Sequence, residues 1–118
     1  MEARPTSLGQ LQDSQKVVDE RSFQLGDYSF DQLGLAQIVR HDLFHLVKLT
    51  GKIAQFCHEL DHGFSPSTDQ LAEEVVPDLL IYALQISNAL GVDLDELYQK
   101  RIRDVEPKLR RDASEDVG

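Results

Sequence analysis

The sequence predicts an all-α protein, a bundle of four helices with a long second helix. Two observations predict this class. Helix-capping patterns begin three segments, and glycines stand where left-handed helix ends would follow, at Gly63 and Gly91. No segment shows the sustained alternation of apolar and polar residues that is typical of a half-buried strand. A length of 118 residues fits a single domain with one core.

Composition narrows the class of protein. No apolar run approaches the roughly 18 residues of a membrane span, and the N-terminus lacks the order of a secretory signal, so we expect a cytoplasmic protein with no membrane partner. The single cysteine, Cys57, lies among apolar residues and is expected to be a buried thiol. A formal net charge of −9 repels phosphate backbones and argues against a nucleic-acid partner.

The first helix is predicted from about Leu8 to Ser22, with Ser7 as its N-cap. It belongs to an N-terminal polar segment that we place at residues 1–27. A helical core is expected at 28–111, followed by an acidic disordered tail at 112–118. These three parts are segments of one domain.

The second helix is predicted to begin at the Ser29 to Gln32 capping box, with Tyr28 and Leu33 as a hydrophobic staple, and to end at Gly63. If unbroken it spans about 33 residues, or roughly 50 Å, although Gly34 or Gly51 can interrupt it. Such a helix is long for a monomer of this size, and apolar residues cover most of its circumference. We therefore expect an assembly of this chain with itself, a dimer or larger.

The third helix is predicted to start at a second capping box, Ser67 to Gln70, and to continue to about Leu90 before Gly91. Pro77 lies inside it and is expected to kink or divide the helix near Val76, because proline removes a backbone hydrogen bond. The fourth helix is predicted from the Asp93 to Glu96 box to around Pro107.

Two of these helices carry polar stripes at spacings of three and four residues. If the stripes face each other, they enclose a cleft that can hold a polar ligand; the alternative is that they are strips of solvent-exposed surface. The stripe of the second helix comprises Gln37, His41, His45, Lys48, Lys52, Gln55, Glu59 and His62, and that of the third comprises Gln70, Glu74, Asp78, Gln85 and Asn88.

Two short motifs stand out in the second half of the chain, Asp78-Leu79-Leu80-Ile81-Tyr82 and Leu90-Gly91-Val92-Asp93-Leu94. With several other short segments in the same order, they resemble the MazG-like nucleotide pyrophosphohydrolases over about residues 30 to 105. The resemblance implies an all-α dimer or tetramer that hydrolyses nucleoside triphosphates to monophosphate and pyrophosphate. In that family Mg²⁺ is held by a helical EExxE motif and a later ExxD motif, because the reaction needs hard oxygen ligands.

The chain departs from the family at these ligands. The EExxE positions align with Gly51, Lys52 and Gln55, so all three carboxylates are absent. Asp78 matches the final residue of ExxD, but its partner position is Val75, and the adjacent Glu74 is the available substitute. We expect Lys52 to take the place of Mg²⁺ by pairing with Asp78, and also with Glu74.

These observations favour a catalytically degenerate MazG-like protein that binds a nucleotide or a protein partner. One alternative is an active, Mg²⁺-dependent pyrophosphohydrolase with a rearranged site, whose metal ligands would be Asp78 and Glu74 with Glu59 or His45. A second is a purely structural helical interaction module. Lys100 matches a lysine that the family often carries. The candidate cleft and nucleotide-binding residues are His41, His45, Lys48, Lys52, Gln55, Glu74, Asp78, Asn88 and Lys100.

The four histidines form two pairs at i, i+4 spacing, His41 with His45 and His58 with His62. This spacing also suits a transition-metal clamp, with Asp78 or Glu74 as a further ligand of the first pair. Residues 58–62 match the HExxH signature of zinc proteases, but no convincing third ligand follows them. Hydrogen-bonded or solvated helix histidines are the simpler interpretation.

Overall fold

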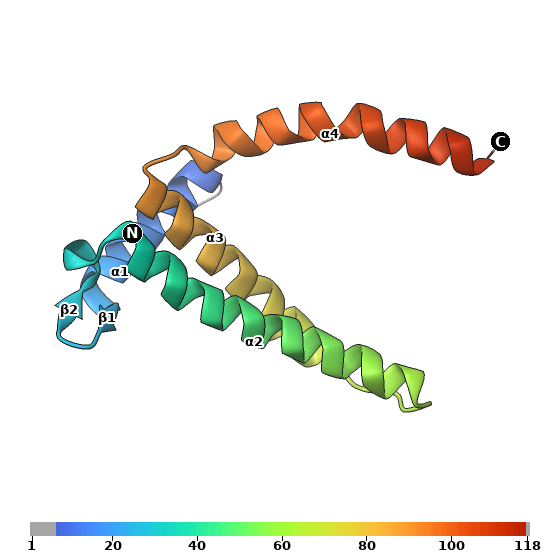
Figure 1. Cartoon of the computed structure of the whole chain (residues 1–118), viewed down its shortest axis with the longest axis horizontal. Coiled ribbons are helices and arrows are strands. Elements are labelled where there is room, and N and C mark those ends of the chain that lie inside the picture. The colour runs from blue at the N-terminus through green and yellow to red at the C-terminus, as the bar shows by residue number, and fades with distance from the viewer. Residues whose placement is uncertain (1–6, 118) are drawn as a thin grey trace, which may run out of the picture.

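The computed structural model describes residues 7–117 and confirms the all-α class. Its helices are α1 (Leu8–Ser22), α2 (Leu35–Asp61), α3 (Val76–Leu90) and α4 (Leu94–Val117) (Figure 1). A small hairpin of β1 (Gln24–Leu25) and β2 (Tyr28–Ser29) follows α1, a 3₁₀ turn covers Phe30–Gln32, and a π-helical turn covers Leu71–Val75.

The beginning of the chain forms as predicted except for the hairpin. Ser7 caps α1 through a complete capping box with Gln10, and α1 has the predicted bounds. The hairpin was missed. Its signal is the two-residue loop Gly26-Asp27, in which Gly26 takes φ 62°, a left-handed conformation that glycine adopts without steric cost.

The second helix begins later than predicted. The Ser29 box caps only the 3₁₀ turn, since the chain is extended at Leu33 and α2 starts after Gly34. Gly34 is therefore the point of interruption, whereas Gly51 lies within the continuous 27-residue α2. The predicted C-terminal end is confirmed, because Gly63 takes φ 82° directly after the helix.

The third helical segment is divided near Val76, as Pro77 led us to expect. The division takes the form of a π turn, in which the Val76 N–H donates to the carbonyl of Leu71, five residues back. This wider turn lies directly before the proline, which has no N–H to continue the regular ladder. Ser67 accepts from the Asp69 N–H at 3.1 Å.

The fourth helix is longer than predicted. Asp93 caps it by accepting from the Glu96 N–H at 3.2 Å, and Gly91 provides the left-handed turn before it. It then passes through Pro107 and continues to Val117, so its predicted end was wrong, and residues 112–117 are helical. Ion pairs one turn apart support it, Lys100 with Asp104 and Arg110 with Glu106.

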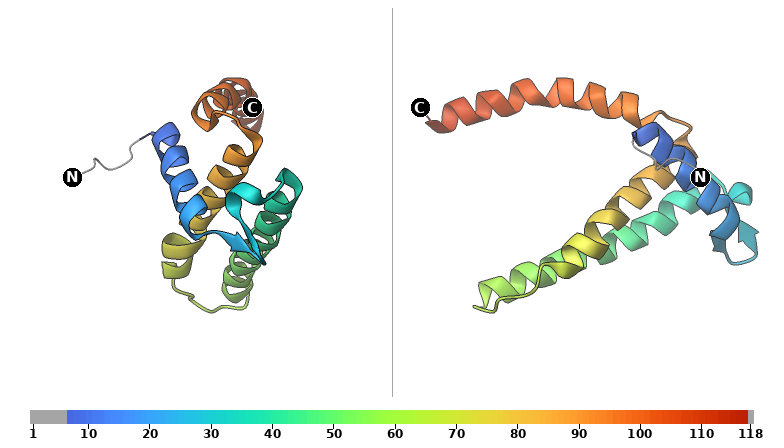
Figure 2. Two further views of the ribbon diagram at one scale, coloured as in Figure 1. Left: turned by 90° about the vertical axis from the view of Figure 1, so that its left-hand side faces the viewer. Right: turned by 180° about the vertical axis from the view of Figure 1, so that it is seen from behind.

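The core lies where α1, the 3₁₀ turn, α2 and α3 meet (Figure 2). Phe23 packs edge-on against Phe30, with ring centroids 5.5 Å apart. The core is small: in the described part of the chain, its buried apolar residues are Phe30, Leu33, Ile38, Leu49, Val75 and Leu84.

The molecule is open for its size. Its radius of gyration is 17.9 Å, against about 13.5 Å for a compact domain of this length. Its accessible surface is 9077 Å², against about 6,500 Å² for a folded monomer of this mass. Figure 1 shows one cause, since α4 extends away from the paired α2 and α3.

A second cause is an apolar face of α2 that no other element covers. We call it the open α2 face; at 100° per residue its members lie on one side of the helix, and Cys57 shares that side. Cys57 is exposed, so the prediction of a buried thiol was wrong. The open α2 face comprises Leu35, Val39, Leu43, Val47, Ile53 and Leu60, whose exposed fractions range from 37% to 60%.

In the described residues, no single helix has both the length and the apolar character of a membrane span. Leu71–Leu90 and Leu94–Ala113 satisfy that condition only as a pair, which is bent by 108°.

Candidate functional site

The predicted cleft between the second and third helices is formed in part. The ring of His45 on α2 stacks on that of Tyr82 on α3, with centroids 5.2 Å apart and planes 15° from parallel. About two turns further along α2, the Lys52 ammonium donates to the Glu74 carboxylate. We define the α2–α3 cleft by His41, His45, Lys52, Glu74, Asp78 and Tyr82.

The ion-pair partner of Lys52 is Glu74. The predicted Lys52–Asp78 pair is therefore not formed. Glu74 lies inside the π turn, which turns its side chain toward α2. The Lys52 hydrogen bond holds the pKa of Glu74 below its ordinary value. The Lys52 side chain is 34% exposed and that of Glu74 is 42% exposed. The ion pair therefore lies at the solvent-exposed edge of this part of the cleft.

Asp78 is half-buried on α3, four residues after Glu74, and its charge affects neighbouring ionisable side chains. Burial raises the pKa of the Tyr82 hydroxyl, and the negative charge of Asp78 adds to that effect. The pKa of the His45 imidazole is lowered mainly by burial, and the negative charge of Asp78 opposes that effect. Asp78 therefore belongs to the His45 and Tyr82 part of the cleft.

A chain of hydrogen bonds leads from the cleft into the core. His45 Nε2 and His41 Nε2 are 3.2 Å apart, and His41 Nδ1 lies 3.0 Å from the Asp42 carboxylate. Asp42 is fully buried, and its burial raises the pKa of this carboxyl group. Sequence reasoning missed Asp42. The available signal was its position between Ile38 and Leu49 on the apolar face that packs inward, where an acidic residue needs a specific partner.

A second buried polar cluster joins α1 to α3. Asp19 Oδ1 accepts from both Gln15 and Gln85 at 2.8 Å. The side-chain amide of Gln12 donates to the Val92 carbonyl at 2.9 Å. The backbone carbonyl of Gln12 accepts from the side-chain amide of Asn88 at 3.0 Å. Gln85 and Asn88 thus face α1, and placing them on the wall of the cleft was wrong.

The other predicted residues lie at the edges of the cleft or outside it. Lys48 is exposed, and its positive charge contributes to the lowered pKa of His45. Gln55 donates to Glu59 on its own helix at 3.1 Å. Lys100 pairs with Asp104 on its own helix, α4, which extends away from α2 and α3 (Figure 1), so Lys100 is not one of the residues that form the α2–α3 cleft.

The structure is hollowed next to Lys52. A cavity of about 70 Å³ lies between α2 and the segment that enters the π turn, and it is lined in part by Lys52, Gln55 and Gln70. A wider, open hollow of about 500 Å³ continues on the other side of Gln55, with Phe64 in its wall. Gln55, Glu59 and Pro66 line both, so the two are contiguous.

The family-type metal site is not assembled here. In the described part of the chain, no group of three or more His, Cys, Asp or Glu residues is arranged to hold a metal ion. Glu74 is engaged with Lys52, and Asp78 lies beside His45 and Tyr82. The arrangement provides an ammonium group, two imidazoles and two carboxylates, which are suited to binding a polar or charged ligand.

Comparison with known families, with curated proteins and with solved structures finds no match to this chain. Function is therefore inferred from the motifs of the sequence and from the geometry of the cleft.

Proposed function

We propose that this chain is a self-assembling, catalytically degenerate MazG-like protein, whose α2–α3 cleft binds a nucleotide without hydrolysing it. The observation that carries the proposal is the ion pair between Lys52 and Glu74. It provides, from the protein itself, the positive charge that Mg²⁺ would bring to a hydrolytic site.

The charge of Lys52 explains why hydrolysis is not expected. A divalent cation next to Glu74 would have to displace the ammonium group or share the carboxylate with it. With Gly51 and Gln55 at the other aligned positions, none of the three aligned positions on α2 carries a carboxylate to hold the ion. An ammonium group can still bind phosphate oxygens, but it does not generate a metal-bound hydroxide.

The π turn supports the resemblance to the MazG-like family. In the aligned motif a carboxylate stands three residues before Asp78, whereas here Glu74 stands four residues before it. A π turn accommodates one extra residue within a helix, and the turn at Leu71–Val75 includes Glu74. An inserted residue would thus shift the motif by one position while leaving Glu74 directed toward α2.

The hollow beside Lys52 has suitable dimensions for a nucleotide. Its wider part, about 500 Å³, falls within the roughly 300 to 1,000 Å³ of small-molecule sites. Lys52 lies in the narrow part, where it can meet phosphate oxygens. Phe64, exposed in the wall of the wider part, offers an aromatic surface to a base.

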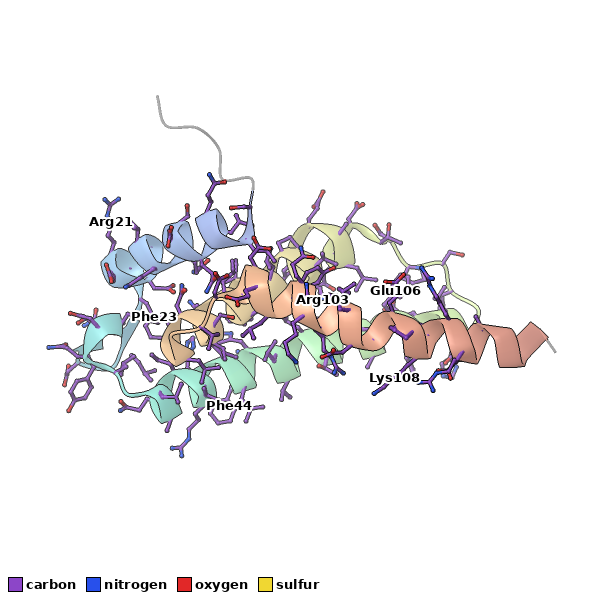
Figure 3. All side chains as sticks on the ribbon, turned by 90° about the horizontal axis from the view of Figure 1, so that it is seen from above. Arg21, Phe23, Phe44, Arg103, Glu106 and Lys108 are labelled. Atoms are coloured by element: carbon purple, nitrogen blue, oxygen red, sulfur yellow. The ribbon has the colours of Figure 1, made fainter. Side chains whose placement is uncertain are left out.

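The open surface supports self-assembly. The excess over a compact monomer is about 2,500 Å² per chain, or about 5,000 Å² for two chains, which lies at the upper end of the roughly 2,000 to 5,000 Å² that obligate homodimers bury in total. Phe44, next to the open α2 face, also points away from the other helices (Figure 3). A second copy of this chain is the occupant we propose for that face, in a dimer or a tetramer.

Hydrolysis is tested by incubating the protein with a panel of nucleoside triphosphates and Mg²⁺ or Mn²⁺, and measuring pyrophosphate. We expect no release above background, and millimolar Mg²⁺ should leave the unfolding midpoint nearly unchanged. Release that is lost in Asp78→Asn would instead favour the active enzyme with a rearranged metal site.

Nucleotide binding is tested by calorimetry in EDTA with the same triphosphates. Lys52→Glu should weaken binding at least tenfold, because it places a negative charge at the phosphate position. Lys108→Glu, an equal charge change on the distant α4, is the matched control (Figure 3). Binding that is absent in the wild type would refute the proposed ligand and leave the structural module as the interpretation.

Assembly is tested by light scattering at micromolar concentration. We expect a dimer or larger, and Leu43→Glu on the open α2 face should reduce the assembly. Lys48→Glu, on the polar side of the same helix, is the control. A well-folded wild-type monomer would contradict the assembly proposal.

A further inference from the structure

The two histidines at the inner end of the cleft have an unusual arrangement. The Nε2 atoms of His41 and His45 approach to 3.2 Å, while their ring centroids are 4.5 Å apart. Because the ring centres are further apart than the two nitrogens, the rings diverge from the point where the nitrogens meet. The two rings therefore approach each other through their Nε2 edges and are not stacked face to face.

This separation matches the bite of a metal clamp. With metal–nitrogen bonds of about 2.0 to 2.1 Å, two imidazoles bound at octahedral or tetrahedral angles have nitrogens about 2.8 to 3.4 Å apart. The i, i+4 spacing on one straight helix fixes the two side chains on the same side. A divalent ion can therefore be accepted with little movement of the backbone.

The second ring nitrogen of His41, Nδ1, has a carboxylate partner, as the second nitrogen of metal-binding histidines commonly does. His41 Nδ1 lies 3.0 Å from Asp42 Oδ1, so the carboxylate can accept a hydrogen bond from Nδ1–H. In that tautomer the Nε2 lone pair can accept from His45 or bind a metal ion. Asp42 is fully buried, and in the described structure its other oxygen has no hydrogen-bond partner. A cation held by His41 would offset the negative charge of this carboxylate through the ring.

Both rings are held in place from the sides. Phe23 packs edge-on against His41, with centroids 4.6 Å apart, and Tyr82 stacks on His45. Ligands whose rotamers are fixed by packing lose little entropy on binding a metal. The second histidine pair, His58 with His62, has the same spacing and ring centroids 4.3 Å apart. In the described residues, however, neither ring has a carboxylate partner comparable to Asp42, and both histidines are exposed.

We propose that His41 and His45 form a two-histidine site for a divalent transition-metal ion such as Zn²⁺, with Asp42 as the residue that positions His41. Imidazole nitrogen selects Zn²⁺, Cu²⁺ or Ni²⁺ over Mg²⁺. In the metal-free protein His45 donates its Nε2 proton to His41. On metal binding, His45 takes the tautomer protonated at Nδ1, and both Nε2 lone pairs bind the ion.

Two protein ligands leave further coordination positions open. Water or an oxygen of a bound ligand would fill them, as in sites whose metal remains accessible. The carboxylates of Asp42 and Asp78 act at His45 in the direction that favours a cation, and the ammonium group of Lys48 acts against it. The metal site occupies the inner end of the same cleft, but its ligands are His41 and His45, whereas the hollow proposed for the nucleotide is lined by Lys52, Gln55 and Phe64. Failure of nucleotide binding would therefore leave the metal proposal standing.

The test is calorimetric titration of metal-free protein with Zn²⁺. We expect one site per chain that His45→Gln removes and His58→Gln retains, the second pair being the matched control on the same helix. Asp42→Asn should weaken Zn²⁺ binding about 10- to 100-fold without changing the stoichiometry, which is typical of a positioning residue. Circular dichroism checks that each variant is folded.

A measurement on the wild type avoids dependence on the variants. In nitrogen-15 NMR spectra of the imidazoles, Zn²⁺ should shift Nε2 of His41 and His45 and fix His45 in the Nδ1-protonated tautomer. Absence of a site in the wild type would overturn the proposal. So would shifts confined to His58 and His62, or equal loss of affinity in His45→Gln and His58→Gln.

Discussion

The Lys52 ammonium on α2 donates to the Glu74 carboxylate in the π turn before α3. This contact joins two segments that are 22 residues apart in the sequence. It also decides the character of the cleft, because the charge facing the carboxylate comes from a side chain that cannot activate water as a metal ion does.

The first prediction concerns the acid side of stability. Lys52 lowers the pKa of Glu74 in the folded state, so the pair contributes stability above the ordinary glutamate pKa, and that contribution is lost as the pH falls through the folded value. Lys52→Ala should move the pKa of Glu74 upward, and NMR titration of its side-chain carboxyl measures this. Because both side chains are partly hydrated, the midpoint of thermal unfolding should change little. An unchanged titration in Lys52→Ala would show that the two groups do not interact.

The second prediction concerns Asp19, which is buried between α1 and α3 with one oxygen unpaired. Burial raises its folded pKa, so its contribution to stability is present below the ordinary aspartate value and is lost as the pH rises through the folded value. Asp19→Asn should remove this loss and raise the free energy of unfolding at neutral pH by about 1 to 3 kcal/mol. Urea unfolding between acidic and neutral pH tests it.

Asp13→Asn, an exposed substitution on the same helix, is the control for Asp19→Asn. If both variants follow the pH dependence of the wild type, burial of the Asp19 charge does not limit stability.

The third prediction compares two glycines. Gly91 takes φ 68° at the end of α3, so Gly91→Ala should destabilise the fold by about 1 to 2 kcal/mol. Gly51 lies inside α2, and an added Cβ there would meet no atom within 4 Å. Gly51→Ala should therefore stabilise the protein by about 0.5 to 1 kcal/mol. Chemical denaturation measures both; the same sign for the two would contradict the backbone argument.

The fourth prediction separates the core from the assembly surface. Leu49 is 3% exposed and Leu43 is 53% exposed, although both lie on α2. Leu49→Ala should cost about 2 to 5 kcal/mol of folding free energy, because it leaves a cavity. Leu43→Ala should leave the fold intact and weaken self-association. Unfolding curves at two protein concentrations distinguish these effects, and a concentration-independent loss in Leu43→Ala would count against the assembly face.

Local features of the fold followed from the sequence. The bounds of α1, the glycine ends at Gly63 and Gly91 and the cap at Asp93 all depend on contacts between residues a few positions apart. The division near Val76 follows from the covalent structure of proline. The start of α2 was placed too early because the Ser29 box caps a 3₁₀ turn, and a capping pattern does not specify how many turns follow it.

The partners of the site residues depended on the tertiary structure. The stripe on α2 was recognisable, but its spacing does not say that Lys52 meets Glu74 rather than Asp78, since that depends on the π turn. Similarly, Gln85 and Asn88 share a helix with the cleft residues and yet bond to α1. The sequence pattern did not single out Asp42, because the neighbouring positions on that face of α2, Ile38 and Leu49, are apolar. The sequence determines which residues lie on one side of a helix, whereas the packing of helices distant in sequence decides what each side faces, because those contacts form only when the chain folds.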